Sequence, residues 1–85
     1  MQITWDEAKR IANLAKHGLD FAALDADFFA DAMVGRARPP CFVAIGRLAS
    51  GAAVTVIFAL LGEEGLSVVS MRPASRKERS RLDAR

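Results

Sequence analysis

The first pattern along the chain is helical. After a short apolar segment at residues 3–5, which predicts a strand, apolar side chains recur every three or four residues. This spacing predicts a helix with one apolar face, formed by Trp5, Ala8, Ile11, Ala12 and Ala15. Thr4 and Glu7 have the spacing of a capping box at its beginning. Gly18 is expected to end the helix, because glycine adopts the left-handed C-cap conformation at little cost.

A second helix is expected directly after this glycine. Asp20 is a suitable N-cap for it. Phe21, Leu24 and Phe28 then follow on one face, so the two helices should form an αα-hairpin. Residues 31–40 are rich in Gly, Arg and Pro, and they are expected to be a loop because two consecutive prolines do not fit inside a strand.

The periodicity then changes from helical to extended. Three runs rich in β-branched and aliphatic residues occupy residues 41–48, 53–61 and 66–71. Turn-forming residues at 50–51 and 62–65 separate them, so the three runs should form an antiparallel meander. The middle run is apolar on both faces and should be the central strand, with the helical hairpin covering one face.

A last, basic helix is expected after these strands, because Ser75 and Glu78 form a second capping-box signature. The complete order is β-α-α-β-β-β-α. We therefore expect one α+β domain that spans residues 1–85: a short N-terminal strand, an αα-hairpin packed on an antiparallel β-sheet meander, and a C-terminal helix.

Composition excludes several functional classes. The hydrophobic content of 52% excludes a disordered tail, and the longest apolar stretch is about half of a membrane span, so we expect no membrane partner. The single cysteine, Cys41, cannot form an internal disulfide, and one His far from it argues against a transition-metal centre, so no cofactor or metal is expected. Without a leader for export, the expected location is cytoplasmic.

The charges are distributed unevenly along the chain. Residues 1–71 contain six Lys/Arg and eight Asp/Glu, a balance of −2, whereas residues 72–85 contain six and two, a balance of +4. A basic segment on a nearly neutral body is typical of a nucleic-acid contact. The alternative is a basic helix that is merely solvated.

One edge of the first helix carries residues that could bind phosphate. Lys9, Asn13 and Lys16 lie at positions i, i+4 and i+7, with His17 beside them. Histidine is the usual proton carrier near neutral pH. The alternative is that Lys16 and His17 only complement the negative end of the helix dipole.

A second group of candidates lies at the junction of the last strand and the last helix. Arg72 ends the strand, and Arg76 and Arg79 lie three residues apart on the helix. Guanidinium groups bind phosphate oxygens through two parallel hydrogen bonds, and the hydroxyls of Ser70 and Ser75 could add donors. We expect these guanidinium groups to converge on one anion-binding pocket. The alternative is a salt-bridged surface on which Arg76, Arg79 or Arg81 pairs with Glu78 or Asp83.

Three segments together resemble the BrnT family of toxin ribonucleases. The opening motif of that family is matched by Trp5-Asp6, Lys9, Asn13, Lys16-His17-Gly18 and Phe21. Residues 42–46 are similar to its second strand, and residues 69–79, VSMRPASRKER, are similar to its closing motif. Met71, Pro73 and Ser75 depart from the usual residues of the closing motif, although Ser75 keeps the hydroxyl.

The resemblance implies a RelE-like toxin that cuts RNA without a metal. It implies active-site residues at Lys16, His17, Arg72, Arg76 and Arg79, and we add an RNA-binding set of Lys9, Asn13, Ser70, Ser75 and Lys77. It also implies a BrnA-type antitoxin with a ribbon-helix-helix domain, and contact with operator DNA only through that antitoxin. The competing hypothesis is a non-catalytic module that binds nucleic acid or antitoxin through the same basic face.

Overall fold

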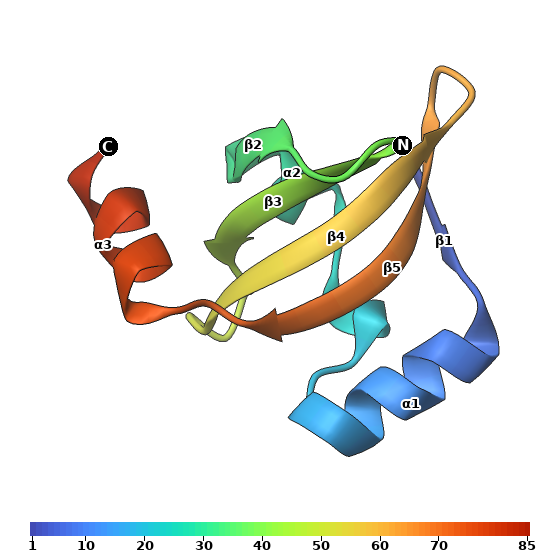
Figure 1. Cartoon of the computed structure of the whole chain (residues 1–85), viewed down its shortest axis with the longest axis horizontal. Coiled ribbons are helices and arrows are strands. Elements are labelled where there is room, and N and C mark those ends of the chain that lie inside the picture. The colour runs from blue at the N-terminus through green and yellow to red at the C-terminus, as the bar shows by residue number, and fades with distance from the viewer.

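The structure, a computed structural model, describes residues 1–85 and is built around one five-stranded sheet (Figure 1). The strands lie in the order β1-β5-β4-β3-β2. Their bounds are Gln2–Trp5 (β1), Met33–Arg36 (β2), Cys41–Arg47 (β3), Ala53–Leu61 (β4) and Gly65–Pro73 (β5). β4 is the central strand, as its apolar sequence predicted, and the meander of β3, β4 and β5 is antiparallel as expected. Only β1 is parallel to its neighbour, β5.

Helices cover the two faces of the sheet unequally. The helices are α1 (Glu7–His17), the 3-10 turn η1 (Phe21–Ala23), α2 (Ala26–Asp31) and α3 (Arg76–Ala84). η1 and α2 pack on one face and α1 lies along β5, whereas α3 extends from the end of β5 on the other face (Figure 1). The predicted order β-α-α-β-β-β-α is confirmed, with one additional strand. None of the helices is long and apolar enough to cross a membrane.

The additional strand, β2, lies in the segment that was expected to be a loop. It pairs antiparallel with β3, from Met33 opposite Ile45 to Arg36 opposite Phe42. The two prolines lie in the turn between these strands, outside both, as predicted. β2 contains a single β-branched residue, Val34, so its own sequence gives little strand signal and the pairing with β3 supplies the structure.

The second predicted helix is divided into two pieces. Asp20 caps η1 by accepting a hydrogen bond from the backbone N–H of Ala22 at 2.9 Å. Asp25 caps α2 in the same way, accepting from Phe28 N–H at 2.8 Å. Because aspartate is a strong N-cap, the second one begins a new helix instead of continuing the first. The predicted inward-facing residues are nevertheless all buried.

Two predictions for α1 are wrong. Asp6, not Thr4, is the N-cap, because Thr4 lies in β1 and its hydroxyl donates to the carbonyl of Leu66. The predicted apolar face is mostly exposed: Ile11 is 57% exposed, and Asn13 is the one buried residue of the helix. Only Trp5, which lies in β1, is half-buried against the main core. Gly18 ends the helix as predicted, with φ of 69° and its N–H bonded to the carbonyl of Leu14.

The main core lies between the sheet and the helices η1 and α2. Phe21, Phe28 and Phe29 pack there against the inward side chains of β3, β4 and β5. Gly46 of β3 provides the space for Phe28, because a Cβ atom at this glycine would lie 2.9 Å from the Phe28 ring. The aromatic residues therefore contribute to the core, and the buried ones are not available to a ligand at the surface.

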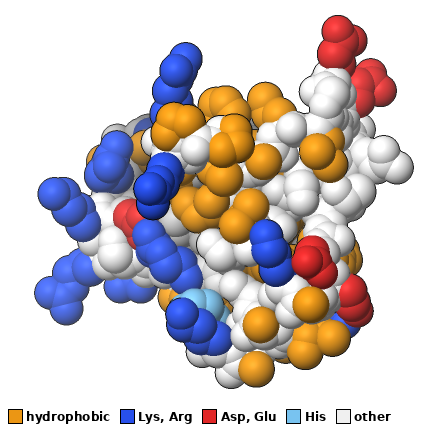
Figure 2. Space-filling model, turned by 45° about the vertical axis from the view of Figure 1, so that its right-hand side comes forward, with side chains coloured by type: hydrophobic (Ala, Val, Ile, Leu, Met, Phe, Trp, Pro, Cys, Tyr) orange, Lys and Arg blue, Asp and Glu red, His pale blue; other side chains and the backbone are white.

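The opposite face of the sheet is only partly covered. A small cluster of Ile45, Ala74 and Leu82 lies under α3. Because side chains alternate along a strand, Ile57 and Leu61 of β4 point to this same face, beyond α3. Figure 2 shows hydrophobic side chains gathered on the surface beside a border of Lys and Arg side chains. Lys and Arg side chains thus border part of this apolar surface.

Candidate functional site

A cleft between α1 and β5 brings together several predicted site residues. Its volume is about 280 Å³, and it is lined by Lys9, Ala12, Asn13, Lys16, His17, Val69 and Ser70. The helical spacing places the lysines and His17 along one edge of α1, as predicted. The pairing of α1 with β5 then places Ser70 opposite them. The end of the first helix therefore lies beside the last strand.

A β-bulge shapes the strand side of this cleft. Ile57 of β4 pairs with Ser70, and Phe58 pairs with Val68, so Val69 is an extra residue without a partner on β4. An extra residue bends the strand and redirects the neighbouring side chains. Val69 and Ser70 consequently both line the cleft. Sequence alone gave no signal for this irregularity.

Asn13 has a different role from the one its position predicted. Its Nδ2 group donates to the carbonyl of Leu19 at 3.2 Å, and its Oδ1 atom accepts from the backbone N–H of Met71 at 3.0 Å. The residue is 7% exposed. Because both ends of the amide bond to the protein, we assign Asn13 to the attachment of α1 to β5 and withdraw it from the set of RNA-binding residues.

Arg72, at the end of β5, is held by a carboxylate. Its Nη1 atom lies 2.7 Å from Oε1 of Glu78 and its Nη2 atom lies 3.0 Å from Oε2, a bidentate pair. The hydrogen bond from Arg72 is the largest cause that lowers the pKa of Glu78 from 4.5 to about 2, and the backbone N–H of Ser75 and the hydroxyl of Thr55 lower it further. Glu78 in turn raises the pKa of Arg72.

The other polar side chains at this junction do not line a pocket together with Arg72. Ser75 caps α3, with its hydroxyl oxygen accepting from the N–H of Glu78, and the predicted capping box is confirmed. Arg79 donates to the carbonyl of Ala74 at 3.3 Å. Arg76 and Lys77 are exposed and form no ion pair. The prediction of one shared anion-binding pocket is therefore wrong: no pocket in the structure is lined by Arg72, Arg76 or Arg79.

Several other arginines are neutralised by carboxylates. Arg10 bonds to Glu7 and to Asp20, and Arg47 of β3 bonds to Asp83 of α3 at 2.9 Å. The alternative interpretation had paired the arginines of α3 with Glu78 or Asp83. The partners of these two carboxylates are instead arginines of the sheet, so the free cations of α3 remain available to a polyanion. The pairing of Glu78 with Arg72 was not predicted from the sequence, although the capping box had drawn attention to Glu78.

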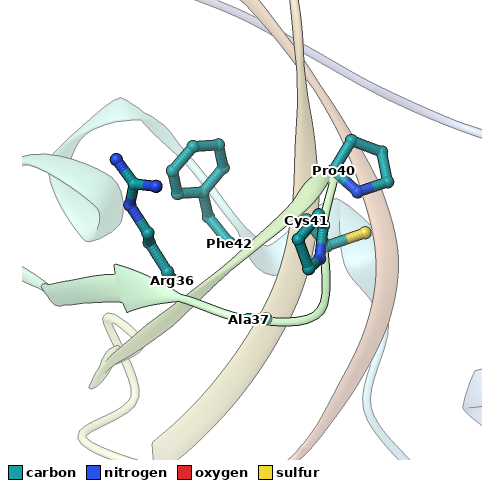
Figure 3. Close-up of a pocket in the computed structure, with 6 residues that line it drawn as sticks. Arg36, Ala37, Pro40, Cys41 and Phe42 are labelled. Atoms are coloured by element: carbon teal, nitrogen blue, oxygen red, sulfur yellow. The ribbon is translucent and has the colours of Figure 1, made fainter.

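A separate pocket lies at the turn between β2 and β3 (Figure 3). It has a volume of about 190 Å³ and is lined by Arg36, Ala37, Pro39, Pro40, Cys41 and Phe42. The thiol of Cys41 is free and half-buried. No group of three His, Cys, Asp or Glu side chains comes together anywhere in a way that could hold a metal ion. This pocket contains neither His17 nor a residue of α3, and we do not assign chemistry to it.

Comparison with known proteins identifies the class to which this fold and site belong. Residues 5–78 match the family model described as "Ribonuclease toxin, BrnT, of type II toxin-antitoxin system". The 1.1 Å crystal structure of the Brucella abortus ribonuclease toxin BrnT is similar, with a TM-score of 0.84 and 49% sequence identity. The similarity covers 89% of this chain and 99% of that one. No match was found among curated proteins.

The chain belongs to the BrnT family. It is thus a ribonuclease toxin of a type II toxin–antitoxin system, and it has RNA as a substrate and an antitoxin as a partner. The resemblance inferred from the three sequence motifs is confirmed, as are the fold class and the enzyme class.

Proposed function

We propose that this toxin cleaves RNA without a metal ion, at the cleft between α1 and β5 and along the adjacent start of α3. The observation that carries the proposal is the cleft itself. In it, the cationic edge of α1 with Lys16 and His17 faces Ser70, two residues before Arg72. A phosphodiester that enters this cleft has cations on one side and a strand with a redirected hydroxyl on the other.

The chemistry assigned to these residues is transfer within the RNA chain. The 2′-hydroxyl loses its proton and attacks the adjacent phosphorus, the bond to the 5′-oxygen breaks, and that oxygen is protonated as it leaves. The product ends in a 2′,3′-cyclic phosphate. His17 exchanges a proton in this scheme, a contribution typically worth about 10²–10⁴-fold in rate. Lys16, Arg72 and Arg76 stabilise the charge on the phosphate, with support from Arg79.

RNA binding is assigned to the neighbouring polar groups. Lys9 lines the cleft, Lys77 and Arg76 are exposed at the start of α3, and Ser70 supplies a hydroxyl. The hydroxyl of Ser75 contributes to this set only if its capping bond to Glu78 is released. Affinity should fall as salt rises, because phosphate contacts release counterions.

A cleavage assay tests the mechanism. Purified toxin is incubated with RNA in the presence and absence of EDTA, next to His17→Ala, Lys16→Ala and Arg76→Ala variants. We expect cleavage that survives EDTA, products with cyclic phosphate ends, and a loss of at least about tenfold for each variant. Abolition of cleavage by EDTA would exclude the metal-free scheme.

The antitoxin is proposed to be a BrnA-type protein with a ribbon-helix-helix domain, through which the complex contacts operator DNA. The toxin itself contributes no DNA contact in this proposal, and both proteins act in the cytoplasm, where the RNA is. Co-expression with such an antitoxin should relieve growth arrest and allow a DNA-binding complex to be isolated. Operator binding by the toxin alone would contradict this assignment.

The competing hypothesis from the sequence is a module that binds RNA without cutting it, which is contrary to the ribonuclease family to which the chain belongs. That module predicts affinity that falls steeply between about 50 and 200 mM salt, with intact RNA recovered at the end. The same assay decides between the two, because a nuclease leaves cyclic phosphate products and a binder leaves none.

A further inference from the structure

Glu78 makes more hydrogen bonds than the cap of a helix requires. Its Oε1 atom accepts from Arg72 Nη1 at 2.7 Å, from Ser75 N–H at 2.8 Å and from the hydroxyl of Thr55 at 3.0 Å. Its Oε2 atom accepts from Arg72 Nη2 at 3.0 Å. The bond from Ser75 completes the capping box, whereas the other three connect α3 to two strands of the sheet.

The sheet register explains why one carboxylate reaches both strands. Thr55 of β4 and Arg72 of β5 are directly opposite each other in the antiparallel ladder. Opposite residues lie on the same face of the sheet, and Glu78 approaches that face from the first turn of α3. Thr55 is 1% exposed, so its hydroxyl is a fixed point from which the position of the carboxylate is determined.

The bidentate pair leaves part of the guanidinium group free. A guanidinium group has five N–H donors in a rigid plane. Glu78 takes one donor from each terminal nitrogen of Arg72, and the carbonyl of Pro73 takes another from Nη1. The Nε donor and the second Nη2 donor remain, and the Arg72 side chain is 46% exposed. These two donors form one edge of the plane, with the spacing of two phosphate oxygens.

We infer that Glu78 is a positioning residue, which holds the guanidinium group of Arg72 in one orientation with its Nε–Nη2 edge presented to the RNA phosphate. The inference rests on the proposed function, in which Arg72 contacts that phosphate. An arginine side chain loses considerable rotational freedom when it is held in this way. Because Glu78 already holds Arg72 in the free protein, this entropy is lost on folding and not when RNA binds. The negative charge of Glu78 is the cost, because it offsets part of the positive charge that attracts RNA.

The test is a comparison of four proteins: wild type, Glu78→Gln, Arg72→Lys and the double variant. Glutamine keeps an oxygen for the capping box and for Thr55, but its NH₂ group faces Nη2 of Arg72 and breaks the bidentate pair. Initial rates on a short single-stranded RNA give kcat and KM for each protein. We expect Glu78→Gln to lower kcat by about 10–100-fold, which is the size of effect that a misplaced group produces.

The Arg72→Lys background separates positioning from simple support of the fold. Lysine cannot form the bidentate pair, so the Glu78→Gln change should alter kcat by less than about threefold in that background. An equally large loss in both backgrounds would show that Glu78 only anchors α3. A gain in kcat in Glu78→Gln would show that the carboxylate blocks Arg72. Either result overturns the inference.

Asp83→Asn is the matched control. It is also a change from carboxylate to amide on α3, and it also breaks an ion pair with an arginine of the sheet, Arg47. It lies away from Arg72, so kcat should stay within about twofold of wild type. A loss as large as that of Glu78→Gln would assign the effect to the docking of α3 and would also overturn the inference.

NMR of the arginine side chains supplies a readout that does not depend on activity. With the pair intact, rotation of the Arg72 guanidinium should be slow and its terminal NH₂ signals resolved; in Glu78→Gln they should merge. Merged signals in wild type would refute the held orientation. Wild type that cleaves no RNA but shows resolved signals would contradict the proposed function. It would leave intact the finding that Glu78 holds Arg72 in one orientation.

Discussion

The side-chain oxygen of Asn13 accepts a hydrogen bond from the backbone N–H of Met71, at 3.0 Å, inside the molecule. β1 pairs with β5 only as far as Val68. Beyond that point, Asn13 takes the place of a strand neighbour by accepting a hydrogen bond from the backbone of β5. The same amide donates to the carbonyl of Leu19 and fixes the turn that follows α1. One side chain thus determines how the cationic edge of α1 lies against the strand that leads to Arg72.

Asn13→Ala should therefore lower the cleavage rate strongly and the free energy of unfolding only moderately. Removal of the amide leaves the buried N–H of Met71 without a partner, at a cost of about 1–3 kcal/mol in the free energy of unfolding. Cleavage should fall by more than about tenfold, because the two sides of the cleft lose their alignment. Urea unfolding and initial rates measure the two effects.

Thr4→Val is the control for that variant. It removes the hydrogen bond from the Thr4 hydroxyl to the carbonyl of Leu66, which also lies on β5 but away from α1. Its cleavage rate should match wild type under conditions in which both proteins are folded. If Thr4→Val and Asn13→Ala lost activity in proportion to stability, Asn13 would have no particular importance for the cleft.

Acidification should destabilise the toxin partly through Glu78. The pKa of Glu78 in the folded protein is about 2, below its ordinary value of 4.5, because Arg72, Ser75 and Thr55 stabilise the carboxylate. A lowered folded-state pKa contributes stability that is fully present above the unfolded-state value and is lost as pH falls from about 4.5 towards 2. Thermal unfolding of wild type across this range should show the loss, and Glu78→Gln should show a smaller one. An identical pH dependence in both proteins would contradict this cause.

Two glycines of the sheet should respond oppositely to alanine. At Gly46, a Cβ atom would meet the Phe28 ring at 2.9 Å and Ala32 at 3.2 Å, so overpacking should cost about 1–3 kcal/mol. At Gly35, a Cβ atom would have only Val43 within 4 Å, at an ordinary 3.8 Å. Gly35→Ala should be neutral or stabilise slightly, by up to about 1 kcal/mol. Calorimetry of both variants checks the contrast, and equal melting temperatures would contradict the packing of α2 on β3.

Two apolar residues that sequence patterns treat alike should differ greatly. Phe21 is 0% exposed and lies in the main core, so Phe21→Ala should cost about 3–5 kcal/mol. Ile11 is 57% exposed on α1, and Ile11→Ala should change stability by no more than about 0.5 kcal/mol. Denaturant unfolding compares them. A large cost at Ile11 would show that the predicted apolar face of α1 is buried after all.

The sequence predicted the elements whose signals are local. The three long strands, the central place of β4, the glycine that ends α1 and the capping box of α3 all follow from spacing within a few residues. β2 was missed because its strand character comes from pairing with β3. The apolar face of α1 was misassigned because the helix lies against β5 through Asn13, and periodicity cannot tell which side of a helix the rest of the chain covers.

The candidate site was also predicted only in part: the edge of α1 was predicted, whereas the arrangement of the arginines was not. The edge of α1 follows from helical spacing, so Lys9, Lys16 and His17 were grouped correctly. The expected arginine pocket failed because it depended on the rotamers of long side chains and on a carboxylate from the next helix. Arg72 bonds to Glu78 across six positions of the chain, and Asn13 bonds to Met71 across 58, contacts that no local pattern specifies.

The parallel pairing of β1 with β5 has a consequence for when the toxin can act. β1 precedes α1 directly, and its partner residues, 65–68, are translated more than sixty positions later. A chain emerging from the ribosome therefore has no place to dock its first helix until the last strand has been made. Translation can therefore run almost to the end of the domain before the two sides of the cleft, where we propose that RNA is cut, come together.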